Sequence, residues 1–190
     1  MIPLDPLVAL CHHRWVLPLL VTVGPSGTRF AVAMRRLDVA RPTLRRALDA
    51  GVEGGWVRSN PGYGHPLRPE YLLTDEGLRL APAAGEVLTV CAREGFTLAG
   101  RKWSLPVLAA LEAGPQRFSA LLARLGRITP RALSTTLEAL VDDGWVERVV
   151  GSAHPPRPVY GLSVRGEPVA AVALELARVA AQAGAHVRGP

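Results

Sequence analysis

Apolar residues in the second half of the chain recur with the period of an α-helix. Four of them fall on one helical face, at spacings of i, i+4, i+7 and i+8: Leu133, Leu137, Leu140 and Val141. Thr129 and Pro130 precede this stripe, and they make a favourable helix start because threonine caps a helix and proline suits its first turn. Gly144 follows as a typical helix end. The pattern predicts a helix over 130–143 with a polar outer face.

The segments around this helix predict a DNA-binding motif. A shorter helical pattern covers 119–125 and is joined to the long helix by a tight connection at 126–128. After Gly144 the pattern becomes β-rich at 145–150, passes through a proline-rich loop and returns to a strand at 159–162. Two helices and a short turn form a helix-turn-helix, and two strands around a basic loop form a wing.

All four tryptophans of the chain fall into two matched pairs. They are Trp15 with Trp103, 88 residues apart, and Trp56 with Trp145, 89 residues apart. The strings WVLPLL and WSLPVL begin at the tryptophans of the first pair, and the pattern His-Pro-x-Arg-Pro-x-Tyr occurs once in each half. The change of offset indicates that the first copy lacks one residue between Asp38 and Leu44. This period predicts an internal duplication of about 75 residues.

The duplication predicts the same elements in the first copy. They are helices near 29–37 and 42–53, strands near 56–59 and 69–73, and a loop at 60–68. An apolar helix begins at the paired tryptophan of each copy. A long helix is predicted at 167–183, and the helical run 87–99 in the junction is expected to pack against it. We therefore expect an α+β, mainly α chain of two winged helix-turn-helix domains, at 1–85 and 86–190.

Charge is spread evenly over the two copies. The chain has a net charge of +6, and residues 1–85 carry 10 Lys+Arg against 7 Asp+Glu while residues 86–190 carry 12 against 9, so each half is +3. Such a balance fits a polyanionic partner. Of the 22 basic residues only Lys102 is a lysine. Arginine suits phosphate and guanine edges, but a GC-rich coding sequence explains the same bias.

Several protein classes are excluded or disfavoured. The longest apolar run, at 15–23, is far shorter than the roughly 20 residues of a membrane span. Two cysteines, Cys11 and Cys91, do not match in the repeat, so we expect no disulfide scaffold and a reducing cytoplasm. The Cys11-His12-His13 run suggests a metal, but adjacent ligands converge poorly, and we expect no metal or cofactor. Without a phosphate loop, a nucleophile elbow or a carboxylate pair, we expect no enzyme.

The segment 91–166 resembles the HxlR-type winged-helix regulators of bacteria. The resemblance is carried by KWSLPVLAAL at 102–111, ITPRALSTTLEALVDDGWVER at 128–148 and PPRPVYGLSVRG at 155–166. It implies double-stranded DNA as partner, and homodimers are usual in the family. A chain with two copies is therefore expected to act as a monomeric pseudo-dimer, with a homodimer as the other arrangement. Cys91 lies where several relatives resemble thiol sensors, although a lone buried cysteine is usually inert.

We expect the outer faces of the recognition helices to enter major grooves and the wings to contact backbone or minor groove. The predicted DNA-binding residues of the first copy are Arg41, Thr43, Arg45, Arg46, Arg58, His65 and Arg68. Those of the second copy are Arg127, Thr129, Arg131, Ser134, Thr135, Arg148, His154 and Arg157. The two wing histidines fit a loop-packing role equally well.

At offset 89, Arg45 and Arg46 align with Ser134 and Thr135, so the two predicted recognition surfaces differ chemically. Unlike surfaces predict an asymmetric DNA site, with more of the specificity in the first copy. A small-molecule effector is expected between the domains, if one exists. The alternative is an interaction or small-molecule module that has lost DNA binding. Its recognition helices should be apolar or acidic, so the basic outer faces favour DNA.

Overall fold

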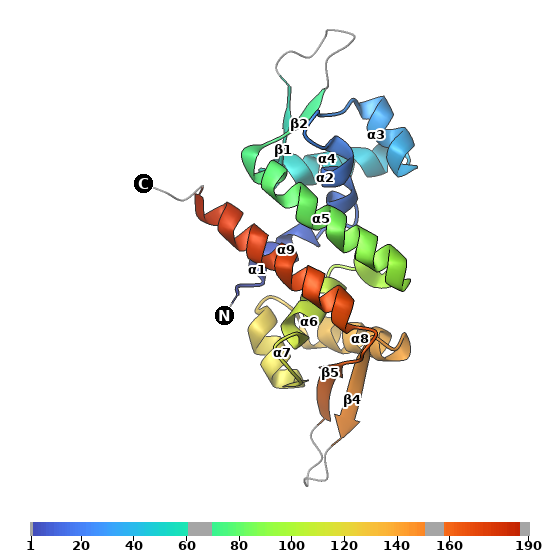
Figure 1. Ribbon diagram of the computed structural model, residues 1–190, viewed down its shortest axis with the longest axis vertical. Coiled ribbons are helices and arrows are strands. Elements are labelled where there is room, and N and C mark those ends of the chain that lie inside the picture. Colours follow the sequence, from blue (N-terminus) through green and yellow to red (C-terminus); the bar gives the residue numbers. More distant parts are fainter. Residues whose placement is uncertain (1, 61–69, 151–157, 187–190) are drawn as a thin grey trace.

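The computed structural model describes residues 2–60, 70–150 and 158–186, with side chains up to residue 183 (Figure 1). The first unit contains α1 (Asp5–Leu10), α2 (Val16–Val23), α3 (Phe30–Leu37), α4 (Arg41–Glu53), β1 (Val57–Ser59), β2 (Tyr71–Leu73) and α5 (Asp75–Glu94). The second unit contains η1 (Thr97–Gly100), α6 (Ser104–Leu111), β3 (Gln116–Arg117), α7 (Phe118–Leu125), α8 (Pro130–Asp142), β4 (Val146–Val150), β5 (Pro158–Leu162) and α9 (Glu167–His186). From α2 onward, the helices and paired strands of the second unit repeat the order of the first.

The predicted helices and strands are present with small changes of boundary. The helix predicted at 130–143 is α8, and the Thr129 hydroxyl caps it by accepting a hydrogen bond from the Ala132 amide at 3.2 Å. Three elements had not been predicted, namely α1, η1 and the short strand β3. The junction helix α5 begins earlier than expected, directly after the first wing, and stops at Gly95, whose φ of 68° is left-handed. A domain boundary at residue 85 would therefore cut α5.

The two units share the same hydrogen bonds where each wing returns to a helix. Thr74 Oγ1 accepts from the Gly77 amide at 3.1 Å and donates to the Gly55 carbonyl at 2.6 Å. Ser163, at offset 89, makes the two equivalent bonds at 3.1 and 2.8 Å. The Thr74 amide also donates to the Trp56 carbonyl at 3.0 Å. In the second unit the Ser163 amide donates to the Trp145 carbonyl at 3.2 Å. The sequence repeat is thus also a repeat of local geometry.

The units differ in their turns and sheets. Residues 38–40 join α3 to α4, whereas residues 126–129 join α7 to α8, so the missing residue of the first copy lies in this turn. The second unit has a three-stranded sheet in the order β3-β5-β4, and the first has the hairpin β1-β2. In the first unit the third strand is reduced to a single bridge between Thr28 and Tyr71. Its equivalent is the pairing of Gln116 with Tyr160.

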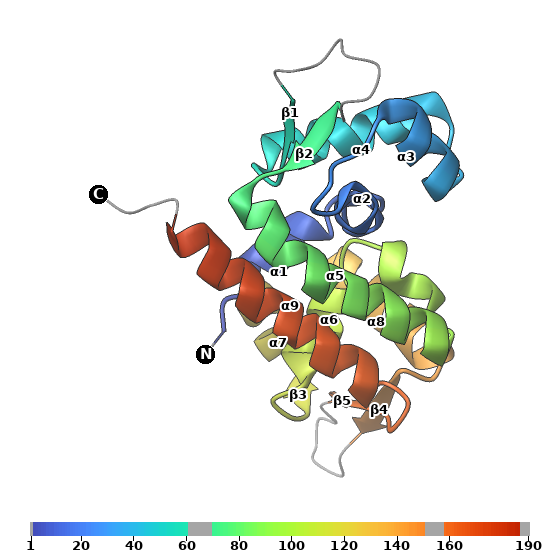
Figure 2. The same ribbon diagram turned by 45° about the horizontal axis from the view of Figure 1, so that its top comes forward.

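The centre of the molecule is formed by α5 and α9, which lie side by side in both ribbon views (Figures 1 and 2). This packing confirms the prediction for the junction helix. The face of α9 that is buried there is rich in alanine, including Ala173 and Ala177, which allows the helices to approach closely. On either side, α2 packs on α5 and α6 packs on α9, and one buried apolar cluster runs through both units. The two wings lie at opposite ends of the molecule (Figure 1).

Candidate nucleic-acid interface

The helices α3 and α4 form the candidate helix-turn-helix of the first unit. Asp38 ends α3 with a φ of 50° and is the one non-glycine residue with positive φ among the described residues. Arg41 opens α4, and its guanidinium lies 5.3 Å from the centre of the Phe30 ring. This cation–π contact connects the start of the recognition helix to α3, while Arg41 itself remains exposed.

Arg45 and Arg46 are both exposed, on two different sides of α4. Arg45 lines a hollow of about 350 Å³ between α4 and the wing, together with Phe30, Ser59 and Tyr71. Arg46 lines a groove of about 250 Å³ on the other side of the helix. The groove is also lined by His13, Arg14, Trp15, Thr43 and Ala47. Both arginines therefore extend the basic surface of α4 toward neighbouring elements, one toward the wing and the other toward the start of α2.

The recognition helix of the second unit, α8, has a more neutral surface. Arg131 and Thr135 are exposed, as predicted, whereas Ser134 is half-buried. The Ser134 hydroxyl donates to Glu138 Oε1 at 3.0 Å, one turn further along the helix. Thr129 uses its oxygen to cap α8. The basic surface of α8 therefore depends mainly on Arg131.

A second groove, of about 400 Å³, lies beside α8 at the position that corresponds to the Arg46 groove. It is lined by Arg101, Trp103, Thr129, Arg131, Ala132, Thr135 and Thr136. In each unit the groove thus joins a recognition helix to the residues around the paired tryptophan. His13, Arg14 and Arg101 also line these grooves, and none of the three was among the predicted contact residues. The repeat contained a signal for them, because basic residues precede the tryptophan in both copies.

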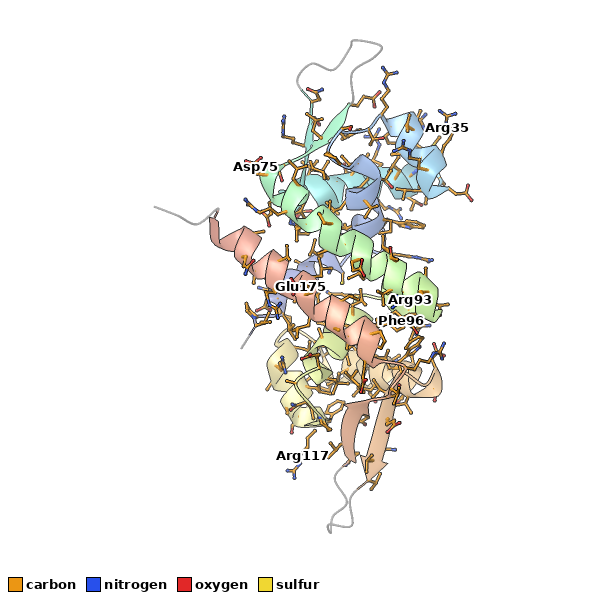
Figure 3. The ribbon with its side chains drawn as sticks, viewed as in Figure 1. Arg35, Asp75, Arg93, Phe96, Arg117 and Glu175 are labelled. Carbon is orange, nitrogen blue, oxygen red and sulfur yellow. The ribbon has the colours of Figure 1, made fainter. Side chains whose placement is uncertain are left out.

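Further basic residues flank the two helix-turn-helices. Arg58 on β1 and Arg148 on β4 are exposed, as a contact with the DNA backbone requires. Figure 3 shows Arg35 on α3 pointing away from the body of the molecule at one end and Arg117 doing so at the other. The predicted wing residues His65, Arg68, His154 and Arg157 lie outside the described residues.

The second unit matches the family model of the HxlR-like helix-turn-helix over residues 98–187. The chain is 33% identical over 78 residues to the helix-turn-helix-type transcriptional regulator YtfH of Escherichia coli K12, covering 41% of this chain and 62% of YtfH. It is 36% identical over 87 residues to a regulator of the same type from Methanothermobacter thermautotrophicus, covering 46% of this chain and 66% of that regulator.

The solved structure of the regulator YodB from Bacillus subtilis, in its reduced form, aligns with 44% of this chain and 82% of YodB. Its TM-score is 0.40 and its sequence identity 28%. This chain spans less than two thirds of the length of YtfH, and each of these matches covers less than half of this chain.

One predicted contact residue of the HxlR-like domain, Arg127, lies in a cleft between the units. The cleft has a volume of about 650 Å³ and is lined by Asp5, Val8, Ala9, His12, His13, Ala50, Glu53, Gly54, Trp56, Lys102 and Arg127. Arg127 is exposed in the turn before α8 and lines this cleft beside residues of α1 and α4. The turn of the HxlR-like domain therefore borders the first unit.

Both cysteines are buried and free. Burial raises the pKa of the Cys91 thiol, which lies just before the HxlR-like domain, to about 12. Burial and, to a lesser degree, the proximity of Cys91 raise the pKa of Cys11 to about 12 as well. Both groups are therefore protonated thiols at neutral pH, which favours the inert interpretation of Cys91 over redox sensing.

No group of three or more His, Cys, Asp or Glu side chains among the described residues is arranged to hold a metal. No helix in the same part of the chain has the length and apolar character of a bilayer span.

Proposed function

We propose that the chain is a transcriptional regulator that binds double-stranded DNA through two winged helix-turn-helix units joined in one chain. The observation that carries the proposal is the repeated geometry. An HxlR-like domain at 98–187 is preceded by a unit with the same order of helices and the same hydrogen bonds around Thr74 and Ser163. In this proposal α5 and α9 take the place of a dimer interface, and the boundary between the units lies near Gly95.

The two recognition helices are proposed to read different sequences. Arg45 and Arg46 leave α4 on two sides, and an arginine can bind guanine O6 and N7 with two hydrogen bonds, worth about 1–3 kcal/mol of discrimination. On α8 the aligned residues are Ser134, which is bonded to Glu138, and Thr135. The first unit is therefore expected to supply most of the specificity, and the preferred site is asymmetric, with one guanine-containing half.

Selection of bound duplexes from a random library tests this proposal. The expected product has two unlike half-sites about one helical turn apart. Recovery of a perfect palindrome would show that two chains pair through one unit each, and it would refute the pseudo-dimer. Absence of any duplex binding at low salt, with promoter DNA included, would refute the regulator itself and favour a protein-interaction module.

A further inference from the structure

The cleft between the units is lined by four charged side chains, of which Lys102 also lies 5.0 Å from the centre of the Trp103 ring. Asp5 and Glu53 come from the first unit, on α1 and at the end of α4, and Lys102 and Arg127 come from the second. None of the four makes an ion pair or a hydrogen bond through its side chain with another described residue. Acidic groups thus border the cleft on one side of the interface and basic groups on the other.

Two of these charges act on His12, an exposed residue that also lines the cleft. Slight desolvation lowers the pKa of His12, nearby Lys102 and His13 lower this pKa further, and Glu53 raises it. A cation from the second unit and a carboxylate from the first therefore lie within electrostatic range of the same imidazole. The formal charges of the four groups cancel, so the cleft is not simply a site for anions.

The remaining lining consists of His13, Gly54 and four largely apolar side chains. Val8 and Trp56 are each 8% exposed, and Ala9 and Ala50 lie beside them. A concave site with an apolar floor and a few charged groups at its edge is typical of small-molecule pockets, and about 650 Å³ is within their usual size range.

The corresponding position of the second unit is filled by protein. At offset 88 the place of Val8 is taken by Phe96, whose ring packs against Trp145 with centroids 4.8 Å apart. The Arg165 guanidinium lies 4.0 Å from the centre of the Trp145 ring and donates to the carbonyls of Asp143 and Glu94. Figure 3 marks Phe96 just beyond the end of α5. The cleft is therefore a feature of one side of the pseudo-dimer.

We propose that this cleft binds one small zwitterion of the amino-acid type per chain. Its carboxylate would pair with Lys102 and Arg127, its ammonium group with Asp5 and Glu53, and its side chain would lie on the apolar floor. An anion without an ammonium group would face two carboxylates, and an amine without a carboxylate would face two cations. Only a ligand with both charges compensates all four groups.

The ligand would connect the two recognition helices. Glu53 is the last residue of α4, and Arg127 lies in the turn that leads to α8. A ligand that pairs with both would favour one relative position of the two helices, and DNA affinity would change with it. This consequence rests on the proposed function, whereas binding in the cleft does not.

Amide chemical shifts of the full chain, measured without DNA, test the proposal with each of the twenty standard amino acids as probe. At least one is expected to give saturable shifts at Ala9, Gly54 and Arg127, with one site per chain. Its analogues that lack either the ammonium or the carboxylate group are expected to bind roughly 10- to 100-fold more weakly. The absence of saturable cleft shifts with all twenty would overturn the proposal, and so would equal binding of either analogue.

Two substitutions and their matched controls assign the charges. Glu53→Gln and Lys102→Gln are expected to weaken binding roughly 10- to 100-fold. The controls are Asp142→Asn and Arg14→Gln, at the corresponding repeat positions outside the cleft, and they should leave binding unchanged. Equal losses in test and control variants would overturn the assignment. A chain that binds the probe but no DNA would refute the proposed function alone.

Discussion

A single methyl group at Gly77 is expected to disrupt the junction between the first wing and α5. A Cβ built on Gly77 would lie 2.1 Å from the Trp56 carbonyl oxygen, and one on Gly166 would lie 2.2 Å from the equivalent oxygen of Trp145. Both contacts are with backbone atoms, which a side-chain rotation cannot relieve. Substitution of either glycine by alanine must therefore move the helix start away from the strand that it follows.

The size of the effect follows from the bonds around Thr74. Moving the start of α5 by about 1 Å weakens the cap from Thr74 to the Gly77 amide and the bond from Thr74 to the Gly55 carbonyl. A lost cap costs about 1 kcal/mol, and each further hydrogen bond about as much. Local repacking destabilises the protein by about 1–3 kcal/mol more. Alanine restricts the unfolded chain more than glycine does, which offsets this loss by about 0.4–1 kcal/mol. We expect Gly77→Ala to lower the free energy of unfolding by about 2–4 kcal/mol.

Urea unfolding followed by circular dichroism measures this change, and α5 supplies its own control. A Cβ on Gly85 would meet only Val21 Cγ2, at 3.7 Å, which is an ordinary contact. Gly85→Ala should therefore stabilise the protein by about 0.5–1 kcal/mol, as alanine does inside a helix. A loss below about 1 kcal/mol in Gly77→Ala, or equal effects of the two substitutions, would refute the close approach on which the estimate rests.

Three other predictions concern DNA and thiol chemistry. Arg45→Ala or Arg46→Ala should lower the discrimination between bases in one half-site by about 1–3 kcal/mol, and Ser134→Ala or Thr135→Ala should lower it less. Binding to duplexes mutated in each half-site measures this, and the reverse order would show that α8 carries the specificity. If about six phosphates are neutralised, duplex affinity should fall roughly a thousandfold between about 50 and 200 mM salt, and a flat titration would contradict an electrostatic interface. Alkylation of native Cys91 at neutral pH should be much slower than in urea, since burial raises its pKa to about 12 and keeps it a thiol; equal rates would indicate an accessible thiolate.

The sequence predicted most of the fold because its signals are local. The apolar stripe of α8 and the Thr129 cap depend on residues within a few turns of one another, and the tryptophan repeat carried the same assignment into the first unit. The helix α1 was missed because it has only six residues, too few for a periodic pattern to appear. The strand β3 was missed for a similar reason, since its two residues are defined by their pairing with β5 rather than by their own sequence.

The candidate site was harder to predict because its parts meet through tertiary packing. The outward positions of Arg45, Arg46 and Arg131 follow from helical period, and the structure agrees. Arg127 illustrates the limit of such reasoning. Its place in a helix-turn-helix suggested DNA contact, yet it borders a cleft whose opposite side is formed by α1 and α4. That arrangement depends on how α5 and α9 pack, which no local pattern in either unit contains.

Small differences between the two copies turn a repeated sequence into a molecule with two distinct sides. Phe96 fills the space beside Trp145, while Val8, its counterpart, leaves a cleft beside Trp56. A homodimer of identical chains would have both spaces filled or both open, because each substitution would appear twice. Two copies within one chain are free of that constraint, because each unit can change alone. The same freedom allows α4 to have two arginines where α8 has serine and threonine, and it would permit the proposed recognition and the proposed ligand binding to be divided between the halves.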